Sequence, residues 1–294
     1  MTVATEAADL RRLCDRVFAP VTQAYDERDT ILYALGLGLG PLAAADPRLL
    51  PYVHETHIRT IPSQVAVLAG PGAWMMDPQA GIDWRSAVAS WYAIDLHAPL
   101  PPRGTVSSAM RIDGVFDRGP GRGAVIQWRR DVRDEDAGGH LLAVIRSTML
   151  ARGNGGFGGP AWPGRAASPV PDRAPDLRFE WQTTPAQPLL YRLCGDRNPL
   201  HADPDVARAA GFEGPILHGL CTLGIACFEL QAWAAQGRVL RGIEARFTAV
   251  VYPGDHLLTE VWTEGRDLLF RMSVPARGVV VLDAGLATTS GNQP

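Results

Sequence analysis

The chain has 294 residues, of which 46% are hydrophobic and 20% are charged, and its formal net charge is −3. This composition is typical of a folded protein and excludes a disordered chain, while the acidic balance argues against nucleic acid as a partner, because proteins that bind a phosphodiester backbone are usually basic. All 28 basic residues are arginine, so an anionic ligand must be met by guanidinium groups, helix N-termini or backbone N–H groups.

The cysteines and the hydropathy indicate a compartment. Cys14, Cys194, Cys221 and Cys227 show no CxxC spacing, so they do not resemble a disulfide framework and we expect reduced thiols. The N-terminus has no apolar signal region, and the chain has no run of about 18 apolar residues. We therefore expect a cytoplasmic protein with no membrane partner.

In the first half, mixed elements precede a series of strands. Residues 7–17 have an amphipathic helical pattern, and Asp29 or Thr30 could cap a short helix that ends at the glycines from Gly36. Residues 62–68 favour a strand, and residues 74–90 show no clear periodicity. Alternating apolar residues and turn signals then predict strands at 91–96, 105–116, 123–132 and 141–150. This order is typical of an α+β fold.

The composition changes after the fourth strand. Residues 152–176 are rich in Gly, Pro and Arg, which favours a linker over a packed core. Beyond it we expect a strand at 178–182, a helix at 219–234 and four closing strands at 241–251, 256–263, 267–274 and 279–288. Both halves end in similar strand series, so they could be two copies of one fold.

Residues 191–201, YRLCGDRNPLH, carry the chemistry that we consider most informative. Asp196 and His201 flank Pro199, which disfavours helix at Asn198, so we expect the acid and the imidazole on an irregular loop. An acid and an imidazole that share one water can take a proton from it and deliver one elsewhere.

A second motif, residues 214–219 (GPILHG), precedes the predicted helix. Free N–H groups at a helix start favour negative charge, and Gly219, which has no side chain, would let a substrate carbonyl approach its N–H. His218 could orient the substrate or simply be a packed histidine. The spacing of His201 and His218 matches no metal-ligand motif, so no metal is expected.

These motifs resemble the signature of hydratase 2, the R-specific enoyl-CoA hydratases of the MaoC-like family. The Gly-Asp-x-Asn-Pro-aliphatic-His core is met in full by residues 195–201, and residues 215–219 and 245–255 also match. Matches in the first half, at residues 33–38, 117–122 and 152–159, are similar to the longer, double-hotdog members.

The resemblance implies a double hotdog of the α+β class, in which two curved antiparallel sheets each wrap a central helix and the N-terminal helix is degenerate, as the poor helix pattern of residues 74–90 suggests. Residues 1–151 would form a non-catalytic hotdog that binds the acyl group and coenzyme A, residues 152–176 the linker, and residues 177–294 the catalytic hotdog.

The resemblance also implies a reaction, the hydration of a trans-2-enoyl-CoA to the (R)-3-hydroxyacyl-CoA, or its reverse, in fatty-acid β-oxidation. Asp196 and His201 would activate the water, Asn198 would order the loop or the water, and the Gly219 N–H would polarise the thioester carbonyl. No cofactor is expected, because coenzyme A is part of the substrate.

Arginines in Gly-rich turns are candidates for binding coenzyme A, namely Arg118, Arg122 and Arg152 with its neighbour Gly153. His218 is a further candidate for contact with the substrate. Residues 65–68 and 74–76 could line an acyl tunnel for a medium, long or bulky chain, including a steroid side chain.

Two other functions remain open at this point, a hotdog acyl-CoA thioesterase and a non-catalytic acyl-CoA-binding protein. The Asn-Pro-x-His spacing argues against the thioesterase, and the intact Asp196 and His201 argue against the binding protein. The family usually forms homodimers, so we expect a homodimer.

Overall fold

The computed structural model describes residues 9–165, 168–235 and 237–292. One ten-stranded sheet runs through the molecule in the order β1-β3-β4-β5-β2-β7-β10-β9-β8-β6. The strands are β1 (Val21–Tyr25), β2 (Ala87–Leu96), β3 (Gly104–Asp117), β4 (Ala124–Asp134), β5 (His140–Ala151), β6 (Leu177–Gln182), β7 (Arg238–Phe247), β8 (His256–Glu264), β9 (Asp267–Val274) and β10 (Val279–Asn292).

The strand order is the same in both halves. The first half has the order β1-β3-β4-β5-β2, and the second half, starting from its outer edge, has the order β6-β8-β9-β10-β7. The strands pair antiparallel in both halves. The two second strands, β2 and β7, pair with each other from Trp91 opposite Arg246 to Asp95 opposite Gly242. The halves are therefore two hotdog-type units whose sheets are joined edge to edge, as the sequence resemblance implied.

Five α-helices and several short turns connect the described strands: α1 (Glu27–Leu37), α2 (Leu39–Ala45), α3 (Gln187–Tyr191), α4 (Pro204–Ala209) and α5 (Gly219–Glu229), which continues as a π-helical turn, Leu230–Ala234. The 3-10 helices are Leu10–Asp15, Pro47–Tyr52, Pro62–Ala66, Trp74–Met76, Pro78–Ala80, Trp84–Ser86, Arg192–Cys194, Pro199–His201 and Pro275–Arg277. No described helix is long and apolar enough to cross a membrane.

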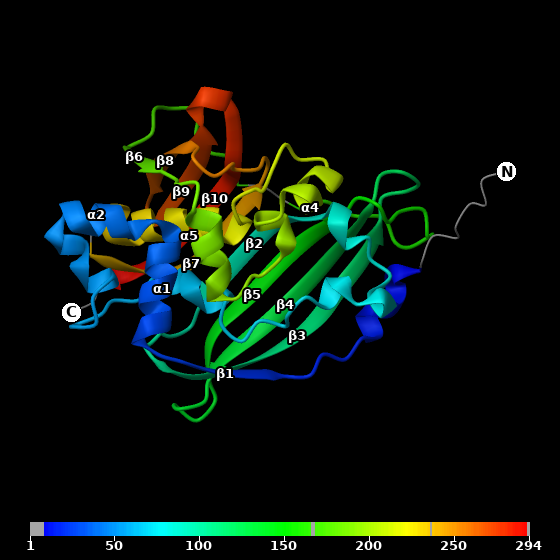
Figure 1. The fold of residues 1–294 in the computed structure, drawn as a ribbon, viewed down its shortest axis with the longest axis horizontal. Coiled ribbons are helices and arrows are strands. Elements are labelled where there is room, and N and C mark those ends of the chain that lie inside the picture. Colours follow the sequence, from blue (N-terminus) through cyan, green and yellow to red (C-terminus); the bar gives the residue numbers. More distant parts are fainter. Residues whose placement is uncertain (1–8, 166–167, 236, 293–294) are drawn as a thin grey trace.

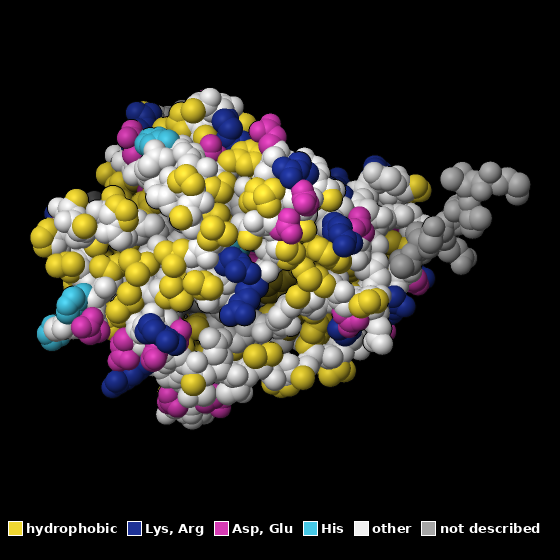
Figure 2. Space-filling model, in the orientation of Figure 1, with side chains coloured by type: hydrophobic (Ala, Val, Ile, Leu, Met, Phe, Trp, Pro, Cys, Tyr) yellow, Lys and Arg dark blue, Asp and Glu magenta, His cyan; other side chains and the backbone are white. Residues whose placement is uncertain are grey.

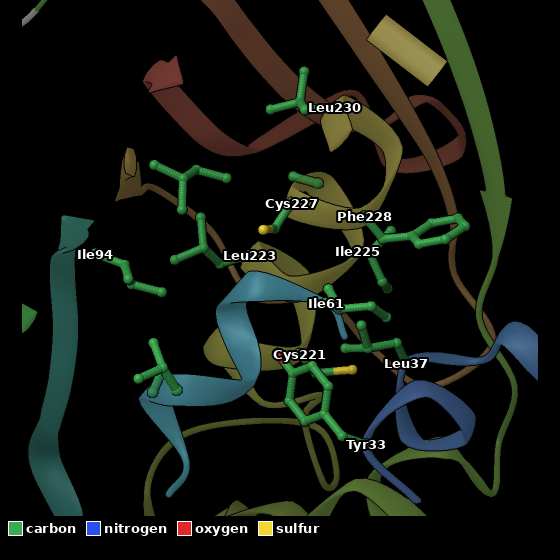
Figure 3. Close-up of a cluster of buried hydrophobic side chains, with 14 of the residues drawn as sticks. Tyr33, Leu37, Ile61, Ile94, Cys221, Leu223, Ile225, Cys227, Phe228 and Leu230 are labelled. Carbon is green, nitrogen blue, oxygen red and sulfur yellow. The ribbon is translucent and has the colours of Figure 1, made fainter. Parts of the chain in front are cut away.

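Helix α5 is the centre of the main core. Every residue from Cys221 to Glu229 is buried, which is expected of a helix that is surrounded on all sides. Figure 3 shows Tyr33 and Leu37 of α1 beside this helix, with Ile94 of β2 on its other side. In Figure 1, α1 accordingly lies next to α5. The first half thus supplies part of the packing around the helix of the second half.

The inner face of the first-half sheet is covered by short turns. Trp74, Ala80 and Ile82 pack with Met110 of β3 and Met149 of β5, and Figure 1 shows these turns in front of β3, β4 and β5. The segment 74–90 forms three 3-10 helices before β2 begins, instead of one long helix. This agrees with a degenerate N-terminal helix.

Three sequence predictions in the first half were wrong in detail. The helix predicted at 7–17 is a 3-10 helix that ends at Asp15, so Val17 lies outside its period and is 91% exposed; Ala7 lies outside the described residues. Asp26, and neither Asp29 nor Thr30, caps α1, because Asp29 is the third helical residue of a capping box. Residues 62–68 begin as a 3-10 helix, since Pro62 starts it and a short buried apolar run does not distinguish helix from strand.

The strand predictions were more accurate. All nine predicted runs other than residues 62–68 lie in the sheet. β7 ends at Phe247, although the prediction extended it to residue 251, and β1 was not predicted. β1 has only five residues at a sheet edge and therefore gives a weak periodic signal. The division into residues 1–151, 152–176 and 177–294 stays a prediction.

Candidate active site

The predicted catalytic loop connects α3 to α4. Gly195 has φ +140, which favours glycine, and Pro199 begins the 3-10 helix Pro199–His201. The Asn198 side chain accepts a hydrogen bond from Leu200 N at 3.1 Å, and Asn198 N donates to Asp196 Oδ1 at 3.2 Å. The loop is therefore irregular but held by its own polar side chains.

His201 is oriented by a backbone carbonyl fifteen residues along the chain. Its Nδ1 lies 2.8 Å from Ile216 O. Because a carbonyl oxygen can only accept, Nδ1 carries the proton and Nε2 keeps its lone pair. Burial lowers the pKa of His201, although the negative charge of Asp196 opposes this shift. A neutral imidazole with a free lone pair is a suitable proton acceptor near pH 7.

Asp196 lies close to that imidazole. A carboxylate oxygen of Asp196 and a ring nitrogen of His201 are within 4.8 Å of each other, and both residues line the same cavity. A single water molecule between them could contact both groups. The arrangement can therefore hold a water, remove one of its protons and deliver a proton to a neighbouring atom.

Gly219 is the first residue of α5 and also lines the cavity. The N–H groups of a first helical turn lack an intrahelical acceptor and favour negative charge. A Cβ at this position would lie 3.1 Å from the Phe247 ring, a tight contact that would require the ring to shift. This end of α5 can stabilise an oxygen on which negative charge develops.

The cavity has a volume of about 640 Å³ and is formed by both halves of the chain. Figure 2 shows a hollow on this face of the molecule, beside a group of arginine side chains. Large apolar side chains make up much of its wall: Trp74, Met75, Met76, Trp84, Tyr92, Trp128, Met149 and Phe247. Residues 74–76 were predicted to line it, as were Ala66 and Val67, whereas Val65 and Leu68 lie outside the wall. The space suits an extended or bulky apolar group.

The arginines predicted to bind coenzyme A are not all near this cavity. Arg152 lines it, but Arg118, Arg122 and Gly153 do not. Gly153 N donates to Ser86 Oγ at 2.9 Å, which holds this turn against the start of β2. Contacts of these three residues with a nucleotide outside the cavity stay predictions.

Sequence reasoning overlooked Arg197, which lines the cavity and is exposed. Its position between Asp196 and Asn198 could have predicted this, because a residue inside a catalytic loop lies near the substrate whatever its type. Arg130 and Tyr92 also line the cavity from β4 and β2. Their position depends on strand register, which no local motif reveals.

Of the two alternatives predicted for His218, the structure fits the packed histidine and not the substrate contact. Its side chain is 0% exposed and does not line the cavity, although Leu217 and Gly219 on either side of it do. It lies behind His201, because the chain turns at this residue into α5.

Asp196, His201 and His218 could be considered as a metal-ligating group, since their ligand atoms lie within 4.8 Å of one another. However, His201 Nδ1 and His218 Nε2 both face backbone carbonyl oxygens and therefore carry protons. Each ring keeps a lone pair on its other nitrogen, and of the three residues only Asp196 and His201 line the cavity, so these two are the groups that can contact a water or a substrate there.

Comparisons with known proteins agree with this geometry. The model of the MaoC-like domain family matches residues 166–284. The enoyl-CoA hydratase ChsH3 of Mycobacterium tuberculosis is 37% identical over 274 residues, which cover 91% of this chain and 93% of that protein. The chain belongs to the hydratase 2 group of the MaoC-like family.

Further relatives extend the similarity to plants and to solved structures. The peroxisomal enoyl-CoA hydratase 2 of Arabidopsis thaliana is 34% identical, with 88% of each chain covered. The crystal structure of a MaoC-like dehydratase from Phytophthora capsici has a TM-score of 0.78 and 27% identity, and covers 97% of this chain and 100% of that chain. The similarity therefore includes both hotdog units of this hydratase 2 homologue.

Proposed function

We propose that this protein catalyses the hydration of a trans-2-enoyl-CoA to the (R)-3-hydroxyacyl-CoA and the reverse dehydration. The observation that carries the proposal is the pair Asp196 and His201, which lie within 4.8 Å of each other on the wall of a large apolar cavity. Relatives named as enoyl-CoA hydratases match over most of the chain.

In the proposed reaction, one water supplies all the atoms that are added. Asp196 and His201 hold this water, its hydroxyl group bonds to C3 of the enoyl group, and a proton is delivered to C2 as the double bond is lost. The Gly219 N–H stabilises the thioester oxygen while enolate charge develops. The thioester itself makes C3 electrophilic, so we propose no metal or redox cofactor.

The wall of the cavity supports the proposed substrate class. Four aromatic side chains of the first half, Trp74, Trp84, Tyr92 and Trp128, line it together with three methionines. This wall favours a medium, long or bulky acyl chain, including a steroid side chain, because large apolar groups gain most from leaving water. We propose that Arg152 and Arg197 bind phosphate groups of coenzyme A near the mouth.

Further proposals concern the assembly and the compartment. Each of the four cysteines is free, and Cys221 and Cys227 are buried, which fits a reducing compartment such as the cytoplasm. We also propose a homodimer, which size-exclusion chromatography with light scattering would test.

The first prediction tests the catalytic pair. Asp196→Asn and His201→Ala should each lower kcat by at least about 100-fold while the protein stays folded, because each removes a general acid or base. Asp205→Asn provides the control, since this carboxylate is exposed on the nearby α4. Activity should be measured as loss of enoyl-thioester absorbance across a panel of acyl chains, from short linear to steroid-sized. Full turnover in either variant would exclude the role we assign to that residue.

The same assay separates the alternative functions. A thioesterase would release free thiol, whereas a hydratase consumes the enoyl absorbance without thiol release. A non-catalytic binding protein would turn over no thioester in the panel. The chain is also similar in structure to an acyl-ACP thioesterase from Bacteroides thetaiotaomicron, but at 14% identity this similarity shows only a shared fold.

A further inference from the structure

His218 is a fully buried titratable residue for which the proposed reaction has no direct use. It is the residue before α5, and its side chain is 0% exposed. Its ring contacts those of Tyr191 and His201, with ring centroids 4.9 Å and 3.7 Å apart. A buried imidazole that contacts both rings requires an explanation beyond simple packing.

The contacts of His218 reach both members of the catalytic pair. Its Nε2–H donates to the backbone oxygen of Asp196 at 3.1 Å. Its ring is stacked on that of His201, with centroids 3.7 Å apart and planes inclined by 25°. One side chain therefore holds the backbone of the acid and supports the ring of the base.

The backbone of His218 also positions the helix start. Its carbonyl oxygen accepts from Cys221 N at 3.0 Å and from Thr222 N at 3.1 Å. Gly219, whose N–H we assign to the thioester oxygen, follows directly in the chain. All three proposed catalytic elements thus contact or adjoin this one residue.

The protonation state of His218 is fixed by its surroundings. Burial, together with the neighbouring His201, lowers its pKa to about 2. Nε2 carries the single proton of the neutral ring, and Nδ1 finds no hydrogen-bond partner among the described residues. His218 therefore stays neutral and takes no part in proton exchange.

We propose that His218 is a positioning residue that sets the separation of Asp196 and His201, through its hydrogen bond to the first and its ring stack on the second. This inference rests on the proposed hydratase function and deepens it. A displacement of about 1 Å in a catalytic group can cost about 100-fold in rate, so a residue that fixes this separation affects kcat more than substrate affinity.

Two variants separate the contributions of the hydrogen bond and the ring. His218→Phe keeps a flat ring but removes the N–H donor, and His218→Gln keeps a donor at a similar reach but removes the ring. We expect kcat to fall by about 10- to 100-fold in the Phe variant, with KM changed by less than about threefold. The Gln variant should recover part of this loss because it can still bind Asp196 O.

Tyr191→Phe is the matched control. It removes a buried hydroxyl group that has no hydrogen-bond partner within the described part of the chain, from a ring that packs against His218. This variant should keep the wild-type kcat. Circular dichroism and thermal melts should accompany every assay, so that loss of folded protein is measured separately from loss of kcat.

Three outcomes would overturn the inference. They are a wild-type kcat in His218→Phe, a loss confined to KM, or equal losses in the Phe and Gln variants that match their loss of folded protein. If the Phe variant does not fold, the Gln variant alone decides, and a wild-type kcat there rejects the role of the ring stack. Failure of the proposed function looks different, since the wild type itself would then turn over no enoyl-CoA.

Discussion

His201 shows how much of the proposed chemistry depends on a single hydrogen bond. The bond from its Nδ1 to Ile216 O leaves Nε2 free as the proton acceptor, and the alternative tautomer would leave no base on that side. The sequence predicted that Asp196 and His201 lie together, because both belong to one short loop. It could not predict the tautomer of His201 or the stacking of His218 on its ring, because these depend on residues that come close only in the folded chain.

The arginines at the cavity give a second prediction at the level of single residues. Arg152 and Arg197 line the cavity and are exposed. Arg152→Ala and Arg197→Ala should each raise KM for a CoA thioester by about two- to fivefold, the effect of an exposed ion pair of ~0.5–1 kcal/mol, with a smaller change in kcat. KM should be measured by initial rates, with Arg208→Ala on α4 as the control.

A shortened substrate makes the arginine test specific. The N-acetylcysteamine thioester of the same acyl group lacks the phosphates, so the two variants should have the wild-type KM for it. An unchanged KM for the CoA thioester would remove that arginine from the proposed phosphate site.

Glu229 at the end of α5 gives a prediction of pH dependence. Its carboxyl group is 0% exposed and accepts a hydrogen bond from Thr259 Oγ1 at 2.6 Å. Burial raises its pKa to about 8, from an ordinary value of 4.5. Between these two values the folded chain keeps a proton that the unfolded chain has lost, so the free energy of unfolding should fall as pH rises, by up to about 1.4 kcal/mol per pH unit.

Glu229→Gln should flatten this slope, because the amide keeps the volume and an acceptor for Thr259 but does not ionise. Urea unfolding at pH values of about 5, 6.5 and 8, which span the window between the two pKa values, measures the slope. Glu213→Gln at an exposed position is the control. Equal slopes in the wild type and Glu229→Gln would show that another group controls the pH dependence.

Among the elements, the catalytic loop lies directly against the first half of the chain. A Cβ on Gly195 would lie 2.9 Å from Val67 O. The segment that contains Val67 is held by Arg130, which donates to Leu68 O and Ala66 O at 2.5 Å each. The loop therefore has little freedom to move away from this contact.

Gly195→Ala tests this contact. Both the clash with Val67 O and the strain of a positive φ should displace Asp196, so we expect kcat to fall by about 10- to 100-fold and stability by about 1–3 kcal/mol. Gly254→Ala is the control, since Gly254 has φ +99 but an added Cβ would meet no atom of the described residues within 4 Å. It should lose stability and keep its kcat. A Gly195→Ala variant with the wild-type kcat would show that the loop tolerates the shift.

The elements also differ in how well the sequence predicts them. Strands such as β3 and β9 alternate buried and less buried residues and are bounded by turn residues, so their period of two was visible in the sequence. The 3-10 helix Pro62–Ala66 leads into a buried apolar run at residues 65–68, which fits either a helix or a strand. Its conformation depends on Arg130, which lies more than sixty residues away and is not visible to a local pattern.

At the scale of the whole molecule, the two hotdog units share one sheet, the main core and the cavity of the candidate active site. β2 and β7 are hydrogen-bonded to each other, and the main core contains Tyr33 and Leu37 of the first half together with α5 of the second. The cavity needs Trp74 and Met149 from one half as well as Asp196 and His201 from the other. Neither half alone therefore has the complete cavity wall or the complete main core.

We expect the chain to unfold in a single transition for this reason. Separation of the halves would expose the edges of β2 and β7 and the apolar surface between α1 and α5, which costs about 25 cal/mol for each Å² exposed. Tryptophan fluorescence reports both halves, through Trp91 and Trp128 in the first and Trp181 and Trp262 in the second. Its urea curve should coincide with that of far-UV circular dichroism, and residues 177–294 expressed alone should have no hydratase activity. Two separate transitions, or an active fragment, would show that the second half is independent of the first.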